Sequence, residues 1–83
     1  MPEASIRRDL KDSLAACYAT RRTIDTSLAH VGHAISKCRA RWPATGTHAE
    51  LARLADQERG LNTDLDRIDG HIAEYTERLR ELP

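Results

Sequence analysis

Apolar side chains recur at alternating steps of three and four residues from Leu10 to Trp42. This spacing places them on one face of a helix and is typical of a coiled-coil seam. Two rows of positions, each with a step of seven residues, make up this face. The d row is Leu10, Cys17, Ile24, Val31 and Cys38, and the a row is Leu14, Arg21, Leu28, Ile35 and Trp42. Arg21 is the only charged residue in either row.

The second half of the chain follows the same rule. Its a row is Leu51, Glu58, Leu65, Ile72 and Leu79, and its d row is Leu54, Leu61, Ile68, Tyr75 and Leu82. Glu58 is the charged exception here. The pattern therefore predicts two long helices, over about residues 4–41 and 48–82.

Between these helices, the sequence predicts a turn over residues 42–47. Pro43 lacks a backbone N–H and disfavours the helical conformation of the residue before it, so the first helix should end just ahead of it. Gly46 adopts positive φ without steric conflict. Thr47 and Glu50 have the spacing of a capping box, so we expect their side chains to cap the N-terminus of the second helix. A connection this short implies antiparallel helices.

Folding the two halves back on each other pairs the a row of the first half with the a row of the second. The two d rows are paired in the same way. Trp42 then meets Leu51, Leu28 meets Leu65, and Leu10 meets Leu82. The chain has no Phe and 31% charged residues, which suits long solvated helices better than a large aromatic core. We predict an all-α fold: residues 1–83 form a single domain, an antiparallel two-helix coiled-coil hairpin.

The two charged seam positions have two interpretations. Within one hairpin, Arg21 lies roughly 21 Å further from the turn than Glu58, and each would face an isoleucine. Both side chains can then extend to solvent from the seam edge. Alternatively, Arg21 and Glu58 set the register of a homodimer. With a twofold axis near Leu28 and Leu65, Arg21 lies level with Glu58 of the second copy, and two antiparallel hairpins form a four-helix bundle.

Few side chains have the spacing of a chemical site. The sequence has no glycine-rich phosphate loop and no evident pairing of a nucleophile with a base, so we expect neither catalysis nor a cofactor. His30 and His33 share a helix face but lack further ligands, and we expect no metal site. Cys17 and Cys38 are expected to be reduced thiols in the seam, although the dimer register would also allow an interchain disulfide.

No stretch is long and apolar enough for a membrane span or a signal peptide, and we expect a cytoplasmic protein. The expected function is protein–protein interaction, as a small adaptor, regulator or inhibitor of the kind that phages and plasmids carry. The candidate contact residues for a protein partner are Tyr18, Ala15, Ala19 and Arg22. Their surface could equally be the dimer contact or an ordinary helix surface.

The alternative function is binding to RNA or DNA. Residues 1–46 contain eight Lys or Arg against four Asp or Glu, whereas residues 47–83 contain five against nine. The basic side chains of the first helix that could contact phosphates are Arg22, Lys37, Arg39 and Arg41. The expected architecture is similar to that of the plasmid regulator Rop, a helical hairpin that dimerises and binds RNA.

Overall fold

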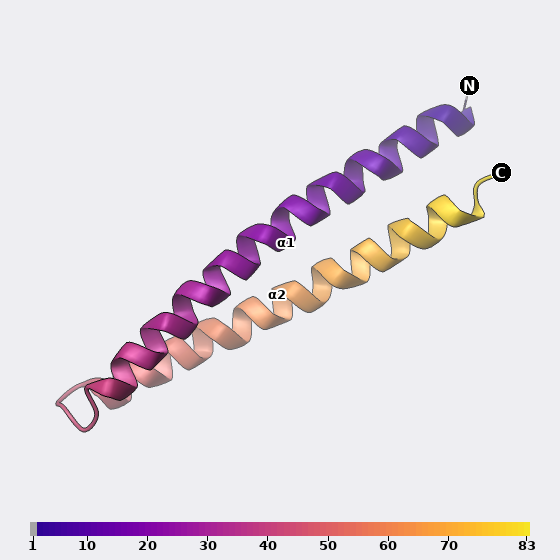
Figure 1. The fold of residues 1–83 in the computed structure, drawn as a ribbon. Coiled ribbons are helices and arrows are strands. Elements are labelled where there is room, and N and C mark those ends of the chain that lie inside the picture. The colour runs from indigo at the N-terminus through magenta and orange to yellow at the C-terminus, as the bar shows by residue number, and fades with distance from the viewer. Residues whose placement is uncertain (1) are drawn as a thin grey trace.

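The computed structural model describes residues 2–83 and shows a helical hairpin (Figure 1). Helix α1 runs from Pro2 to Ala40 and helix α2 from Thr47 to Glu81. The two helices lie antiparallel and form a rod of 64 × 14 × 13 Å. The predicted all-α hairpin is therefore confirmed.

The best-packed part of the seam lies in the half of the rod nearest the turn. Val31, Cys38 and Leu54 form a buried cluster there, and Cys38 is 0% exposed. Partly buried apolar side chains from both helices surround this cluster: Ala34, Ile35, Leu51 and Leu61. The predicted pairing of the d rows at these levels agrees with this cluster.

The start of α2 differs from the predicted capping box. Gly46 is the N-cap residue, with φ of 86°, and no side chain caps the helix. The Thr47 hydroxyl instead donates a hydrogen bond back to the Ala44 carbonyl at 2.7 Å. The Glu50 carboxylate accepts a hydrogen bond from Arg41 at 2.8 Å. The capping box was thus a wrong prediction, because the left-handed glycine already turns the chain and each side chain has another partner.

Trp42 also differs from its predicted place in the seam. Helix α1 ends at Ala40, so Trp42 no longer follows the helical spacing that would direct its side chain towards Leu51. Its side chain is 45% exposed, and its ring lies edge-on to the His48 imidazole with centroids 4.1 Å apart. The a row of α1 therefore ends at Ile35.

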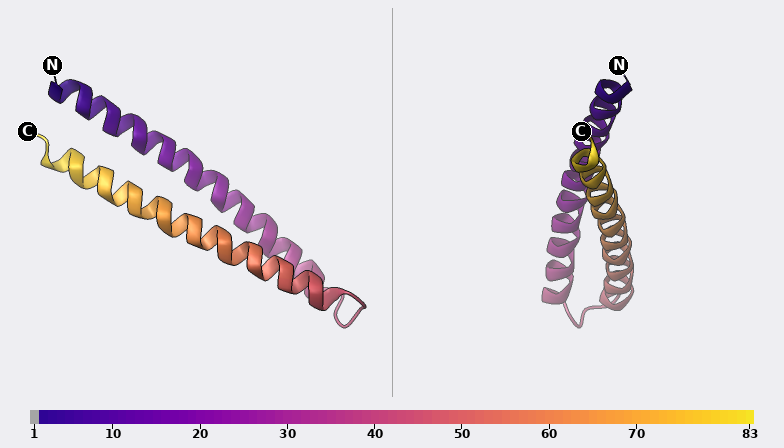
Figure 2. Two further views of the ribbon diagram at one scale, coloured as in Figure 1. Left: turned by 180° about the vertical axis from the view of Figure 1, so that it is seen from behind. Right: turned by 90° about the vertical axis from the view of Figure 1, so that its right-hand side faces the viewer.

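The two ends of the hairpin lie side by side, opposite the turn (Figure 2). A guanidinium N–H of Arg7 donates a hydrogen bond to the backbone oxygen of Pro83 at 2.9 Å. This contact joins residues 76 positions apart in the sequence. The start of α1 and the end of α2 are thus held together at the open end of the rod.

Candidate functional site

One side of the hairpin retains an exposed apolar surface, because α2 covers the two rows of α1 unequally. Four of the five d-row residues of α1 are buried: Leu10, Ile24, Val31 and Cys38. The a-row residues Leu14, Leu28 and Ile35 are only partly buried. Because two antiparallel right-handed helices present their a rows on the same side, the partly buried a-row residues gather on one face. On α2, the d-row residues beyond Leu54 are partly buried as well: Leu61, Ile68, Tyr75 and Leu82.

We call this surface the open face. On α1 it consists of Leu14, Arg21, Leu28 and Ile35, and on α2 of Leu51, Glu58, Leu65, Ile72 and Leu79. Apart from Arg21, which is exposed, all of these residues are partly buried. A side chain that touches one helix and still faces water can gain further burial from a third helix. The open face is therefore the main candidate interaction site.

Arg21 has a partner that the sequence analysis missed. Its Nε lies 3.3 Å from a carboxylate oxygen of Asp69 on α2, and the two side chains are 44% and 45% exposed. Asp69 precedes Ile72 by three residues, so it lies at the edge of the open face and reaches across it. The pairing of a and d rows does not predict this contact, because Asp69 lies at a position flanking both rows.

Glu58 lies on the same face as Arg21 but elsewhere along the rod. It is partly buried, and within residues 2–83 it makes no ion pair. The hairpin thus brings Arg21 to Asp69 and leaves Glu58 separate, as their positions along the two helices require.

The predicted partner-binding residues are divided between two surfaces. Tyr18 is 43% exposed and lies beside the open face, four residues after Leu14 and three before Arg21. Ala15, Ala19 and Arg22 are exposed further around α1, on the side away from α2. Tyr18 is therefore the member of this set that lies nearest the open face.

The basic residues of the two helices differ in how they are paired. On α2, four arginines each bind a carboxylate of their own helix: Arg59 with Asp56, Arg67 with Asp64, Arg78 with Glu74, and Arg80 with Glu77. Directly after α1, Arg41 pairs with Glu50. Arg22, Lys37 and Arg39 are exposed, and among residues 2–83 no carboxylate lies at ion-pair distance from them.

The two thiols lie in the seam. Cys38 is fully buried, and its Sγ lies 3.5 Å from the Thr47 carbonyl oxygen. Cys17 is partly buried, and both thiols are free in this chain. Among the residues that the structure describes, no three His, Cys, Asp or Glu side chains are grouped closely enough to hold a metal ion.

Neither α1 from Pro2 onwards nor α2 contains an apolar stretch that could cross a membrane. No protein-family model, no curated protein and no solved structure matches this chain.

Proposed function

We propose that this chain is a non-catalytic interaction module whose open face is covered by the open face of a second copy. The observation that supports this proposal is the partial burial of the whole a row on α2, together with Leu14, Leu28 and Ile35 on α1. Two such faces packed together would form the core of a four-helix bundle.

The exposed area of the hairpin is consistent with a missing partner. The chain exposes 6015 Å², whereas a compact protein of its mass exposes about 5000 Å². Its radius of gyration is 18.7 Å, against about 12 Å for a compact domain of this length. The excess of about 1000 Å² is comparable to the roughly 800 Å² that each partner contributes to a standard interface.

The charges on the open face would fix the register of the two copies. With the twofold axis near Leu28 and Leu65, Arg21 lies level with Glu58 of the second copy. The Arg21 guanidinium has five N–H donors, so it can bind Asp69 of its own chain and this second carboxylate together. Buried ionic groups contribute little net stability, but they discriminate between registers.

Sedimentation velocity at high micromolar concentration tests the dimer. We expect the wild-type chain to sediment with twice the mass of one chain. Arg21→Leu or Glu58→Leu alone should weaken or misalign the dimer, and the double variant should associate again, because two apolar residues replace the ion pair. Arg53→Leu is the control, because Arg53 is exposed on α2 outside both rows. A wild-type monomer under these conditions would contradict the proposal.

Tyr18 offers a second contact, to a different protein. Its ring is exposed beside the open face, and aromatic side chains of this kind often contribute most to protein interfaces. The adaptor, regulator or inhibitor role is thus proposed to use Tyr18 with its exposed neighbours Ala15, Ala19 and Arg22. Tyr18→Ala should abolish capture of the partner from the native host while sedimentation of the dimer stays unchanged. A dimer that dissociates in Tyr18→Ala would assign this ring to self-association instead.

A second candidate function, binding to RNA or DNA, is favoured by the unpaired basic residues of α1. Arg22, Lys37 and Arg39 remain available to phosphates, whereas Arg41 already binds Glu50. Replacing the first three by Glu should abolish such binding, and binding should weaken steeply with added salt. An interaction that is insensitive to salt and survives these charge reversals would exclude nucleic acid as the partner.

A further inference from the structure

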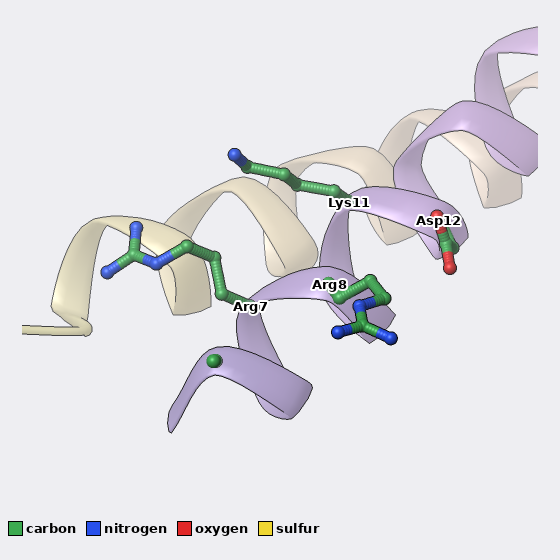
Figure 3. Close-up of a pocket in the computed structure, with 5 residues that line it drawn as sticks. Arg7, Arg8, Lys11 and Asp12 are labelled. Atoms are coloured by element: carbon green, nitrogen blue, oxygen red, sulfur yellow. The ribbon is translucent and has the colours of Figure 1, made fainter. Parts of the chain in front are cut away.

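Three basic side chains line a hollow in the first three turns of α1; Arg7 and Lys11 extend to one side of it and Arg8 to the other (Figure 3). The hollow has a volume of about 380 Å³. It is lined by Ala4, Arg7, Arg8, Lys11 and Asp12. Ala4 is the one lining residue with a short apolar side chain. Three positive charges and one negative charge give this small volume a formal net charge of +2.

Arg8 and Lys11 are not neutralised within the hairpin. Both are exposed, and no carboxylate of residues 2–83 lies at ion-pair distance from either. Their environment is unlike that of α2, where Arg78 and Arg80 each bind an acidic side chain of the same helix. The charge of the hollow is therefore available to a ligand.

Arg7 differs from the other two cations because it is already held in place. Its side chain extends towards α2 (Figure 3), and one guanidinium N–H donates to the backbone oxygen of Pro83 at 2.9 Å. That oxygen uses one donor, so the remaining N–H groups of Arg7 stay free.

We propose that this hollow binds a small phosphate-bearing anion. Two guanidinium groups offer planar pairs of N–H donors that match phosphate oxygens, and a lysine ammonium adds a further charge. A formal charge of +2 suits a phosphate dianion better than a single carboxylate. The volume of about 380 Å³ falls within the roughly 300–1000 Å³ of ordinary small-ligand sites.

The test is a titration of the isotope-labelled chain with inorganic pyrophosphate at constant ionic strength, followed by backbone amide NMR shifts. We expect saturable shifts confined to residues 4–12. The double variant Arg8→Gln/Lys11→Gln should bind at least tenfold more weakly. The matched control, Arg53→Gln/Arg59→Gln, removes the same formal charge from exposed positions of α2 outside the hollow and should change the affinity less than twofold. Circular dichroism checks that both variants remain helical.

Replacing Asp12 should change the affinity for pyrophosphate in the opposite direction. Its carboxylate repels an anion in the hollow, so Asp12→Asn should tighten pyrophosphate binding severalfold. Equal weakening in the two double variants, or weaker binding in Asp12→Asn, would mean general electrostatic attraction to the chain and would overturn the proposal.

A single-stranded oligonucleotide serves as the second ligand. If it shifts amides along the whole of α1 while pyrophosphate shifts none, the hollow is not a phosphate site and the nucleic-acid function gains support. Arg8 and Asp12 lie away from the open face, whereas Arg7 and Lys11 continue the rows of Leu14 and Tyr18 at the end of the rod. We expect Arg8→Gln/Lys11→Gln to sediment like the wild-type chain, so that failure of one proposal leaves the other intact.

Discussion

Gly46 has a backbone conformation that few other residues can adopt. Its φ of 86° is the only positive φ among residues 2–83, and it lies directly before α2. Gly60 is different, because it lies inside α2 and an added Cβ there would meet open space. Replacement by alanine should therefore have opposite effects on the free energy of unfolding at the two positions.

We predict that Gly46→Ala lowers the free energy of unfolding by about 1–2 kcal/mol, because an L-residue is strained in the left-handed region. Gly60→Ala should raise it by about 1 kcal/mol, because alanine favours the helix interior. Urea denaturation followed by circular dichroism measures both. A neutral or stabilising Gly46→Ala would show that the turn relaxes to another conformation.

Thr47 provides a second prediction at the residue scale. Its buried hydroxyl donates to the Ala44 carbonyl at 2.7 Å, whereas the exposed Thr63 hydroxyl donates to the Arg59 carbonyl within α2 at 3.0 Å. Thr47→Val should lower the free energy of unfolding by about 0.5–1.5 kcal/mol, because a buried hydrogen bond is lost. Thr63→Val should change the free energy of unfolding little, because water can donate a hydrogen bond to the Arg59 carbonyl in place of the Thr63 hydroxyl. Equal effects in the two urea curves would mean that the Thr47 contact does not stabilise the turn.

At the scale of the helices, the heptad pattern was sufficient to predict the hairpin. Pro43 and Gly46 marked the turn, and Val31, Cys38 and Leu54 are packed together as the d rows required. The pattern could not show which row α2 would cover more fully. That depends on the rotation of each helix about its own axis, and the a and d rows are similar in hydrophobicity.

Other features of the candidate site depend on contacts that heptad positions do not describe. Asp69 reaches Arg21 from a position that flanks the a row, and pairing of the a and d rows does not predict this contact. Trp42 lies outside α1, which ends at Ala40, and its ring packs against His48. The hollow at the open end depends on the Arg7 side chain reaching Pro83, a contact set by the folded-back end of the hairpin.

Alanine variants of Leu54 and Leu65 distinguish packing within the hairpin from contact with a second copy, because Leu54 belongs to the d row of α2 and Leu65 to its a row. Leu54 is 4% exposed within the hairpin, whereas Leu65 on the open face is only partly buried. Leu54→Ala should cost about 2–5 kcal/mol of folding free energy, as for other buried leucines.

Leu65→Ala should act mainly on association. We expect the dimer dissociation constant from sedimentation equilibrium to rise at least tenfold, which corresponds to about 1.4 kcal/mol. An unchanged dissociation constant in Leu65→Ala would mean that the open face does not hold the second copy.

At the scale of the whole molecule, the thermal transition should depend on protein concentration. A partner that binds only the folded chain stabilises it by mass action. We therefore expect the midpoint temperature of unfolding, measured by circular dichroism, to rise steadily as the protein concentration increases from low to high micromolar. A hairpin that folds alone would melt at one temperature at every concentration, and this result would contradict the four-helix bundle.

The adjacency of the two ends has a practical consequence. The hydrogen bond between Arg7 and Pro83 keeps the start of α1 beside the end of α2, while the turn lies at the far end of a rod 64 Å long. A host protein could therefore carry the hairpin as an insertion in a single surface loop, without separating the two halves of that loop. The inserted hairpin would display Trp42 at its tip, well away from the host protein. The fluorescence of Trp42 would then report contacts made at that tip.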